Sequence, residues 1–290
     1  MDNERTTQAT PRRYTKLIGA ASALAALMAF GSAATGNAAT STSTSPELFP
    51  NSSFDHSVVN QPVSADRSNY MNHLVNQYAT NYGSVGVNRM PIFTVPANQP
   101  LVPVSLASGC YGSFLSTLGN GVPIPPSAYT TNSSDEDIII SQPSTGQEWE
   151  LWQATQTNGH WSACWGGGLS LGSTGVFPAP YGMSATGISY LATTITEADV
   201  ASGHINHAIA MQIVNCNGYV APADRGDCTS FVAPVLRRLL HLPTGSAGAP
   251  PEGTWFRMPQ STPMPAGLTP YAQMVFRTLQ TYGAVVVDKA

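Results

Sequence analysis

Positive charge is scarce in this chain of 290 residues, in which Lys16 and Lys289 are the only lysines. Charged residues of both signs make up 10% of the chain, and the formal net charge is -4. Proteins that bind nucleic acid carry clusters of Lys and Arg that neutralise phosphates, so we exclude nucleic acid as a partner. Hydrophobic residues make up 42% of the chain, which is enough for a sizeable core.

Several motifs of catalytic and metal-binding proteins are missing as well. The sequence has no glycine-rich phosphate loop and no nucleophile elbow. Its cysteines lack zinc-finger spacing, and the acidic run at 135–137 lacks the spaced oxygen ligands of a calcium loop. We therefore expect no metal and no cofactor.

The first 39 residues have the three parts of a secretory signal peptide. Basic residues precede an uncharged run at 17–30 that is rich in Ala and Leu, and small residues follow it. The run is too short to cross a bilayer comfortably. We predict a secreted, extracellular protein with no stable membrane anchor after cleavage; an anchoring N-terminal helix is the alternative.

All four cysteines lie beyond this segment, at Cys110, Cys164, Cys216 and Cys228. An even number of cysteines in an exported chain indicates disulfides, here two of them with three connectivities open. Cys216 and Cys228 are close enough in sequence to close a local loop. We therefore favour a Cys216–Cys228 disulfide and a longer link between Cys110 and Cys164.

The chain divides into a leader and one domain. Residues 40–65 are rich in Ser, Thr and Pro, which predicts a flexible leader before a single domain at 66–290. Helices are expected near 66–82, 231–241 and 270–282. Short apolar runs separated by Gly and Pro fill the rest and are typical of strands and turns. The sequence predicts a mainly β fold, a two-sheet antiparallel sandwich with two or three peripheral helices.

The clearest local feature is a β-hairpin that turns at Asn158-Gly159, a dipeptide typical of two-residue turns. If Thr157 pairs with His160, then Trp152 lies opposite Trp165. Because side chains alternate along a strand, this register predicts two carboxylates and three indoles on one sheet face: Glu148, Glu150, Trp152, Trp161 and Trp165.

Carboxylates beside indoles are typical of sugar-binding clefts. Aromatic rings cover the apolar faces of pyranose rings, while carboxylates accept hydrogen bonds or act as acid and base. We expect a polysaccharide ligand bound by Trp152, Trp161 and Trp165, and in a lyase or hydrolase Glu148 and Glu150 would be catalytic. The alternatives are a non-catalytic binding module and a structural secreted protein whose indoles fill an ordinary core.

Two further residues are candidates. Arg257 alternates with Trp255 and is suited to pair with a substrate acid or a buried carboxylate. His207 is a candidate catalytic base, although a buried histidine with a hydrogen-bonded partner is the more ordinary interpretation. The alternating run around it predicts a strand, which sends His204 and His207 to opposite faces and excludes a metal site shared between them.

Five stretches share a pattern with known sequences: Trp149–Trp152, Gly203–Ala208, Tyr219–Ala223, Pro251–Arg257 and Tyr282–Asp288. Through them the chain, from Asp137 onward, resembles a family of exported bacterial proteins, common in actinobacteria, whose activity is uncharacterised. The resemblance implies a jelly-roll, concanavalin-like sandwich of the kind used by polysaccharide lyases, hydrolases and lectins. It implies no catalytic residues, because fold does not fix function.

Overall fold

The computed structural model describes residues 48–81, 89–110, 112–213 and 249–289. The predicted signal peptide, the predicted helix at 231–241 and the predicted Cys216–Cys228 disulfide lie outside the described residues.

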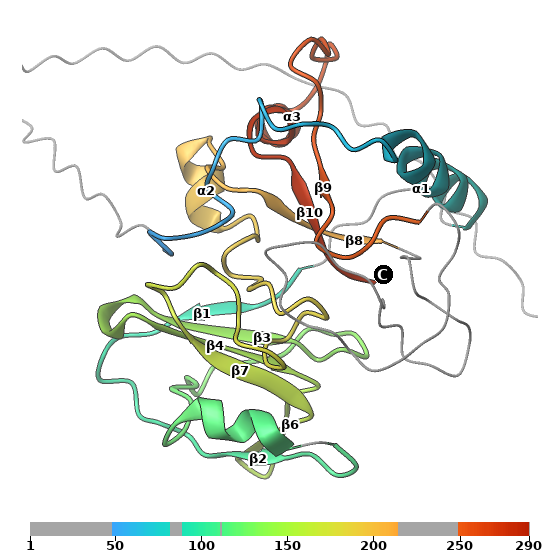
Figure 1. The fold of residues 1–290 in the computed structure, drawn as a ribbon. Coiled ribbons are helices and arrows are strands. Elements are labelled where there is room, and N and C mark those ends of the chain that lie inside the picture. Colours follow the sequence, from blue (N-terminus) through green and yellow to red (C-terminus); the bar gives the residue numbers. More distant parts are fainter. Residues whose placement is uncertain (1–47, 82–88, 111, 214–248, 290) are drawn as a thin grey trace, which may run out of the picture. The chain divides into compact units, whose positions relative to one another are not determined.

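The largest sheet has the strand order β1-β3-β4-β7 (Figure 1). Its strands are β1 (Ile92–Thr94), β3 (Ile138–Gln142), β4 (Gln147–Trp152) and β7 (Trp165–Ser170). All five residues of β3 are buried, as are the four central residues of β4. The centre of this sheet is therefore covered on both faces, which explains why β3 begins with three consecutive isoleucines rather than with an alternating pattern.

Two smaller sheets complete the β structure. One has the order β8-β10-β9 and the other the order β2-β6-β5. Their strands are β2 (Val104–Leu106), β5 (Thr155–Thr157), β6 (His160–Ala163), β8 (Ile209–Ile213), β9 (Trp255–Phe256) and β10 (Ala284–Lys289).

Each of the three sheets contains one parallel pair of strands, namely β1 with β3, β8 with β10 and β2 with β6. The mainly β fold is thus confirmed, but the prediction of purely antiparallel sheets is wrong, and a two-sheet jelly-roll sandwich is not confirmed. The alternation along one strand reports which faces are covered and carries no information about the direction of its partner.

The helices are α1 (Arg67–Asn81), α2 (Glu197–Ser202) and α3 (Pro270–Thr281), with short 3-10 turns η1 (Gly112–Leu118) and η2 (Pro143–Thr145). The helices predicted near 66–82 and 270–282 are confirmed. α3 begins where the sequence indicates, because the Thr269 side chain accepts a hydrogen bond from the Ala272 amide and Pro270 follows the cap. No helix in the described ranges is both long and apolar enough to cross a membrane.

The predicted hairpin register is confirmed. Thr157 pairs with His160 around Asn158 and Gly159, whose φ angles of 51° and 81° suit this tight turn. Trp152 pairs with Trp165 in the same register. The hairpin is nevertheless divided between two sheets, because Gln153 has a φ of 47° and turns the chain between β4 and β5.

Two hydrophobic clusters cover opposite faces of the largest sheet. Ile139 of β3 belongs to one of them and its neighbours Ile138 and Ile140 to the other, as alternation requires. We name them the Phe177 cluster and the Phe114 cluster after a fully buried member of each. The Phe177 cluster includes Phe49, Phe54, Ile139, Leu169, Ile188, Leu191 and Val285. The Phe114 cluster includes Ile138, Ile140, Trp149, Leu151, Trp161 and Ala163.

The predicted leader is packed against the domain. Phe49 and Phe54 are 1% and 0% exposed and belong to the Phe177 cluster, and the Phe54 ring stacks on Trp255 at a centroid distance of 5.9 Å. The prediction of a flexible leader over 40–65 is therefore wrong for Phe49 and Phe54, whereas residues 60–65 are exposed. The prediction depended on the Ser, Thr and Pro content of the segment and overlooked two phenylalanines, whose rings bury a large apolar area.

Glycines in β7 allow η1 to lie against the sheet. A Cβ on Gly168 would come within 2.5 Å of the Thr117 carbonyl oxygen, and the Gly168 amide donates to the Thr117 hydroxyl at 3.2 Å. Gly166 has a φ of 151°, and a Cβ there would lie 2.2 Å from the Glu150 carbonyl oxygen. The side chains missing from this strand thus make room for backbone from two other elements.

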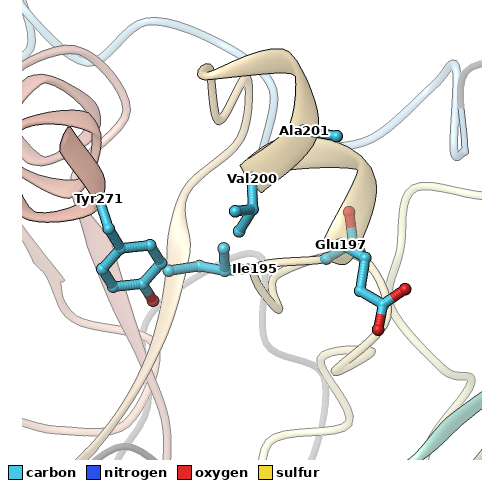
Figure 2. Close-up of a pocket in the computed structure, with 6 residues that line it drawn as sticks. Ile195, Glu197, Val200, Ala201 and Tyr271 are labelled. Atoms are coloured by element: carbon cyan, nitrogen blue, oxygen red, sulfur yellow. The ribbon is translucent and has the colours of Figure 1, made fainter. Parts of the chain in front are cut away.

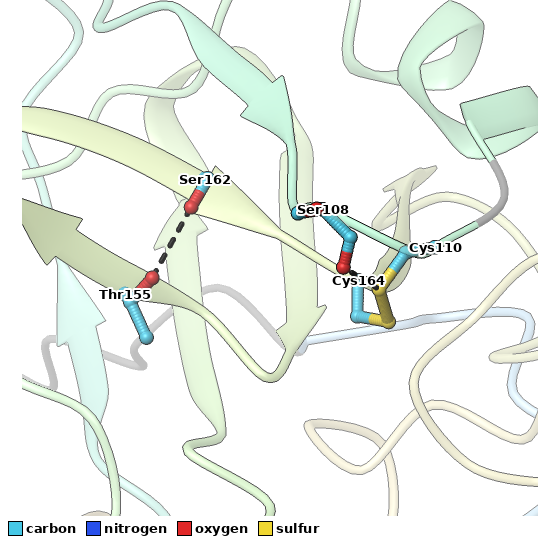
Figure 3. The surroundings of a disulfide bond; sticks show 5 residues. All are labelled: Ser108, Cys110, Thr155, Ser162 and Cys164. Atoms are coloured by element: carbon cyan, nitrogen blue, oxygen red, sulfur yellow. Dashed lines mark hydrogen bonds between the residues drawn. A yellow bond between two sulfur atoms is a disulfide. The ribbon is translucent and has the colours of Figure 1, made fainter.

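The predicted disulfide between Cys110 and Cys164 is confirmed (Figure 3). It joins residues 54 apart in sequence and ties the segment after β2 to the junction of β6 and β7. Beside it, a hydrogen bond of 3.1 Å between the Thr155 and Ser162 hydroxyls links the two strands of the hairpin (Figure 3).

Candidate functional site

The structure divides the predicted Glu/Trp face between the two sides of the sheet. Trp152 packs against the Phe177 cluster, whereas Trp161 and Trp165 belong to the Phe114 side. Glu150 lies on the Phe177 side, where it accepts hydrogen bonds from Ser189 and Leu191. The prediction that all five residues share one face is therefore wrong for Trp161 and Trp165. The positive φ angles of Gln153 and Gly166 interrupt the alternation on which the prediction depended.

Three carboxyl groups are buried together on the Phe177 side, and we name Asp137, Glu148 and Glu150 the carboxyl cluster. Their exposed fractions are 4%, 0% and 0%. Asp137 directly precedes β3, and Glu148 and Glu150 stand two residues apart on β4, so the pleat directs both to one face. In the described part of the chain no ion pair reaches any of the three.

The hydrogen bonds of the cluster are unevenly shared. Glu150 Oε1 accepts from the Ser189 hydroxyl and from the Leu191 amide, both at 3.1 Å. Neither oxygen of Glu148 has a hydrogen-bond partner among the described residues, nor does Glu150 Oε2. Ser141, which is 1% exposed and pairs with Glu148 across the strands, has no partner for its hydroxyl there either. Buried polar groups are nearly always satisfied, so this group of atoms is unusual.

Burial shifts the acidity of all three groups. Burial raises the pKa of Asp137 to about 7, and the negative charges of Asp135, Asp288 and Glu150 add to the effect. Burial also raises the pKa of Glu150 to about 7, although its hydrogen bonds oppose the rise. For Glu148, burial and the neighbouring Glu150 raise the pKa well above its ordinary value, against a smaller lowering by the Ser189 hydroxyl. The cluster therefore holds protons at neutral pH.

The cluster is closed to solvent, which limits its chemistry. A general acid or base must lie within hydrogen-bond reach of its substrate, and fully buried carboxyl groups have no such access in this structure. Among the described residues, no group of three or more His, Cys, Asp or Glu is arranged to hold a metal ion.

Comparison with known proteins identifies no relative. No family model, curated protein or solved structure matches the chain. Function is therefore inferred from the residues themselves.

Trp165 is half-buried and lies beside two other aromatic rings. The centroids of its indole and of the Tyr181 ring lie 6.4 Å apart with their planes 29° from parallel, and its indole also meets Phe114 at 5.8 Å with the planes tilted by 49°. We name these two residues the Trp165–Tyr181 pair. Tyr181 is also half-buried and contacts both hydrophobic clusters. Sequence reasoning missed Tyr181, because a tyrosine in a Pro-rich loop has no periodicity that would place it beside β7.

The other two predicted tryptophans differ in accessibility. Trp161 is 4% exposed and is a core residue of the Phe114 cluster. Trp152 is half-buried, and its Nε1 donates to Asp135 Oδ1 at 3.3 Å. The ordinary interpretation of the indoles as core residues thus applies fully to Trp161 and in part to Trp152.

His207 has its own partners, and no described contact joins it to the carboxyl cluster. Its Nδ1 lies 2.9 Å from the Ala208 carbonyl oxygen, and its Nε2 lies 3.5 Å from Asp199 Oδ2. Burial alone would raise the pKa of Asp199, but hydrogen bonds from His207 and Thr196 bring it below its ordinary value. Thr196 and Asp199 also form the capping box of α2. The hydrogen bond between His207 and Asp199 therefore lies at the start of a helix and has a structural role. His204 and His207 both precede β8 rather than lying in it, and His204 is exposed.

Arg257 binds main chain instead of an acid. Its guanidinium donates to the carbonyl oxygens of Val58 and Val59, and to that of Gln61 at 2.8 Å. These three bonds attach the segment after Phe54 to β9, so the observed role of Arg257 is structural.

A shallow depression of about 350 Å³ lies beside α2 (Figure 2). Its walls are mostly apolar, with Val200 and Ile195 on one side and Tyr271 reaching toward them from α3 (Figure 2). Binding sites combine an apolar wall with several polar groups that converge on the ligand. The Glu197 carboxylate points away from Tyr271 (Figure 2), so the depression lacks that convergence.

Proposed function

We propose that this chain is an exported protein that binds extracellular polysaccharide without cleaving it. The observation that supports the proposal is the Trp165–Tyr181 pair, two half-buried rings that are 29° from parallel. Flat aromatic surfaces of this kind stack on the apolar faces of sugar rings, and a polymer needs a platform rather than an enclosed pocket.

The pair is held in place before any ligand arrives. Trp165 begins β7, pairs with Trp152 across the strands and rests on Phe114. The residue before it, Cys164, is fixed by the disulfide to Cys110. A platform that is already ordered loses little conformational entropy on binding, which favours affinity.

Binding is favoured over catalysis because of the carboxyl groups. Glycoside hydrolases place two carboxyl groups on either side of the bond to be broken. Here Glu148 and Glu150 are 0% exposed and lie on the side of the sheet opposite the cluster that contains Trp161. A lyase or hydrolase built on them would have no substrate within reach.

Two observations support export. The N-terminal pattern of basic residues, apolar run and small residues is that of a secretory signal. The Cys110–Cys164 disulfide is of the kind that forms and persists outside the cytosol.

The test is retention of the protein on insoluble plant, fungal and bacterial cell-wall glycans. Replacing one ring, in Trp165→Ala or Tyr181→Ala, should weaken retention about fivefold, the value of one stacking contact of roughly 1 kcal/mol. Tyr129→Ala is the matched control, because Tyr129 is 64% exposed and packs on Phe93 instead. Equal loss in all three variants, or no retention of the parent protein, would reject the proposal. Release of new reducing ends would replace it with an enzymatic function.

A further inference from the structure

The carboxyl cluster lies against the segment at 184–193. Hydrogen bonds join this segment to the cluster on one side and to β10 on the other. Glu150 Oε1 accepts hydrogen bonds from the Ser189 hydroxyl and from the Leu191 amide. At the other end, Asp288 Oδ2 of β10 accepts from the Ala185 amide at 3.0 Å and from the Tyr190 hydroxyl at 3.3 Å. The segment is therefore attached to β4 and to β10 through carboxylates.

Every titratable group that faces the cluster in the described part of the chain is an acid. Besides its own three members these are Asp135 before β3, Tyr190 of the segment and Asp288 of β10. The contribution of β8 is the neutral Gln212, which donates to the Tyr190 hydroxyl at 3.0 Å. Each proton lost from the cluster therefore adds negative charge among like charges, and no cation among the described side chains is close enough to compensate.

Glu148 is the member best placed to hold a proton. Its two oxygens, Glu150 Oε2 and the Ser141 hydroxyl are all buried without a described partner. The Ser189 hydroxyl donates its hydrogen bond to Glu150 Oε1, and its lowering effect on the pKa of Glu148 is smaller than the rise caused by burial and by Glu150. A protonated Glu148 has one O–H donor, for which the unsatisfied oxygens around it are acceptors. An ionised Glu148 has only acceptors, and no hydrogen bond from a described donor reaches either of its oxygens in this structure.

We propose that the carboxyl cluster is a proton-dependent clasp, in which the proton on Glu148 keeps the 184–193 segment closed against β4. When this proton is lost at high pH, the new carboxylate repels Glu150, whose Oε1 accepts hydrogen bonds from Ser189 and Leu191. The segment then loosens while the sheet beneath it stays intact.

The clasp has a consequence for the Trp165–Tyr181 pair. The Phe177 amide donates to the Gly187 carbonyl at 2.8 Å, so the segment holds the loop that carries Tyr181. Loosening of the segment would release Tyr181 from Trp165. This consequence rests on the proposed function, whereas the clasp itself does not.

Hydrogen exchange of the full chain, followed by mass spectrometry between about pH 6 and about pH 9, tests the clasp directly. After correction for the intrinsic pH dependence of exchange, protection of peptides from the 184–193 segment should fall at least about tenfold, as expected for one proton lost over one pH unit. Protection of a peptide from β3 should fall by a smaller factor than protection of the segment.

Glu148→Gln is the decisive variant, because an amide is neutral at every pH and supplies a donor. It should keep the 184–193 segment protected at high pH. Glu197→Gln, which removes an exposed carboxylate in the first turn of α2, is the matched control and should behave like the parent. The same pH response in Glu148→Gln as in the parent would overturn the clasp, and so would a loss of protection that is equal in every peptide.

A second measurement covers the case in which Glu148→Gln does not fold. Infrared spectra of the parent protein should show the carbonyl band of a buried, protonated carboxyl group at neutral pH. This band should disappear over the pH range in which the segment loses protection. Absence of the band at neutral pH would overturn the clasp even if glycan retention were observed, and failure of glycan retention alone would leave the clasp unaffected.

Discussion

Replacing Phe54 with alanine tests whether the N-terminal segment is part of the core. The side chain is 0% exposed, and its ring stacks on Trp255 with the planes 12° apart. Its carbonyl also accepts from the Ala208 amide at 2.7 Å, just before β8. Truncation of a buried phenylalanine removes its transfer free energy and leaves a cavity, and together these cost about 3–5 kcal/mol. We expect the free energy of unfolding to fall by this amount in Phe54→Ala.

Urea denaturation at fixed pH, followed by tryptophan fluorescence and circular dichroism, measures the change. Val63→Ala is the matched control from the same predicted leader, because Val63 is 56% exposed and its loss should change stability by at most about 0.5 kcal/mol. A loss of less than about 1 kcal/mol in Phe54→Ala would show that the segment does not contribute to the core. Our description of the N-terminal part of the domain would then be wrong.

Three further predictions concern stability. Removing the disulfide in Cys110→Ser should lower the free energy of unfolding by about 4 kcal/mol from the entropy of a loop of this length, measured by urea denaturation; an unchanged midpoint would contradict the pairing. Gly166→Ala should destabilise the fold severely, because a Cβ would lie 2.2 Å from a carbonyl oxygen, whereas Ala at the open turn position Gly146 should cost far less; thermal melting of both variants checks this. Burial raises the pKa of Asp137 and of Glu150 to about 7, so between about pH 4 and about pH 7 the folded state binds more protons than the unfolded state. Stability should therefore be full at low pH and fall by up to roughly 3 kcal/mol per group as the pH rises to 7, and denaturation curves that show rising stability over this range would refute the burial of these groups.

Local signals in the sequence predicted local structure well. The Asn158-Gly159 turn set the register of the hairpin as far as Trp152, and the helical pattern near 270–282 predicted α3. The spacing of the cysteines favoured the disulfide between Cys110 and Cys164 that the structure contains. Each of these features depends on neighbours in sequence or on a small set of combinations.

The features that sequence reasoning missed depend on distant partners. Ile92 pairs in parallel with Ile139 and Ala284 with Ile209, and the periodicity of either strand contains no information about that partner. The Glu150 carboxyl group is buried beneath a segment whose Leu191 amide donates to it, and Leu191 lies 41 residues away in the sequence. Two residues with positive φ, Gln153 and Gly166, interrupt the alternation and so separate the indoles.

The position of β10 affects the order in which the chain folds. This strand lies between β8 and β9, and neither of them pairs with any other strand of that sheet. Since ribosomes make proteins from the N-terminus, both outer strands lack their partner until residues 284–289 have been added. Assembly of this sheet is thus a late event of biogenesis.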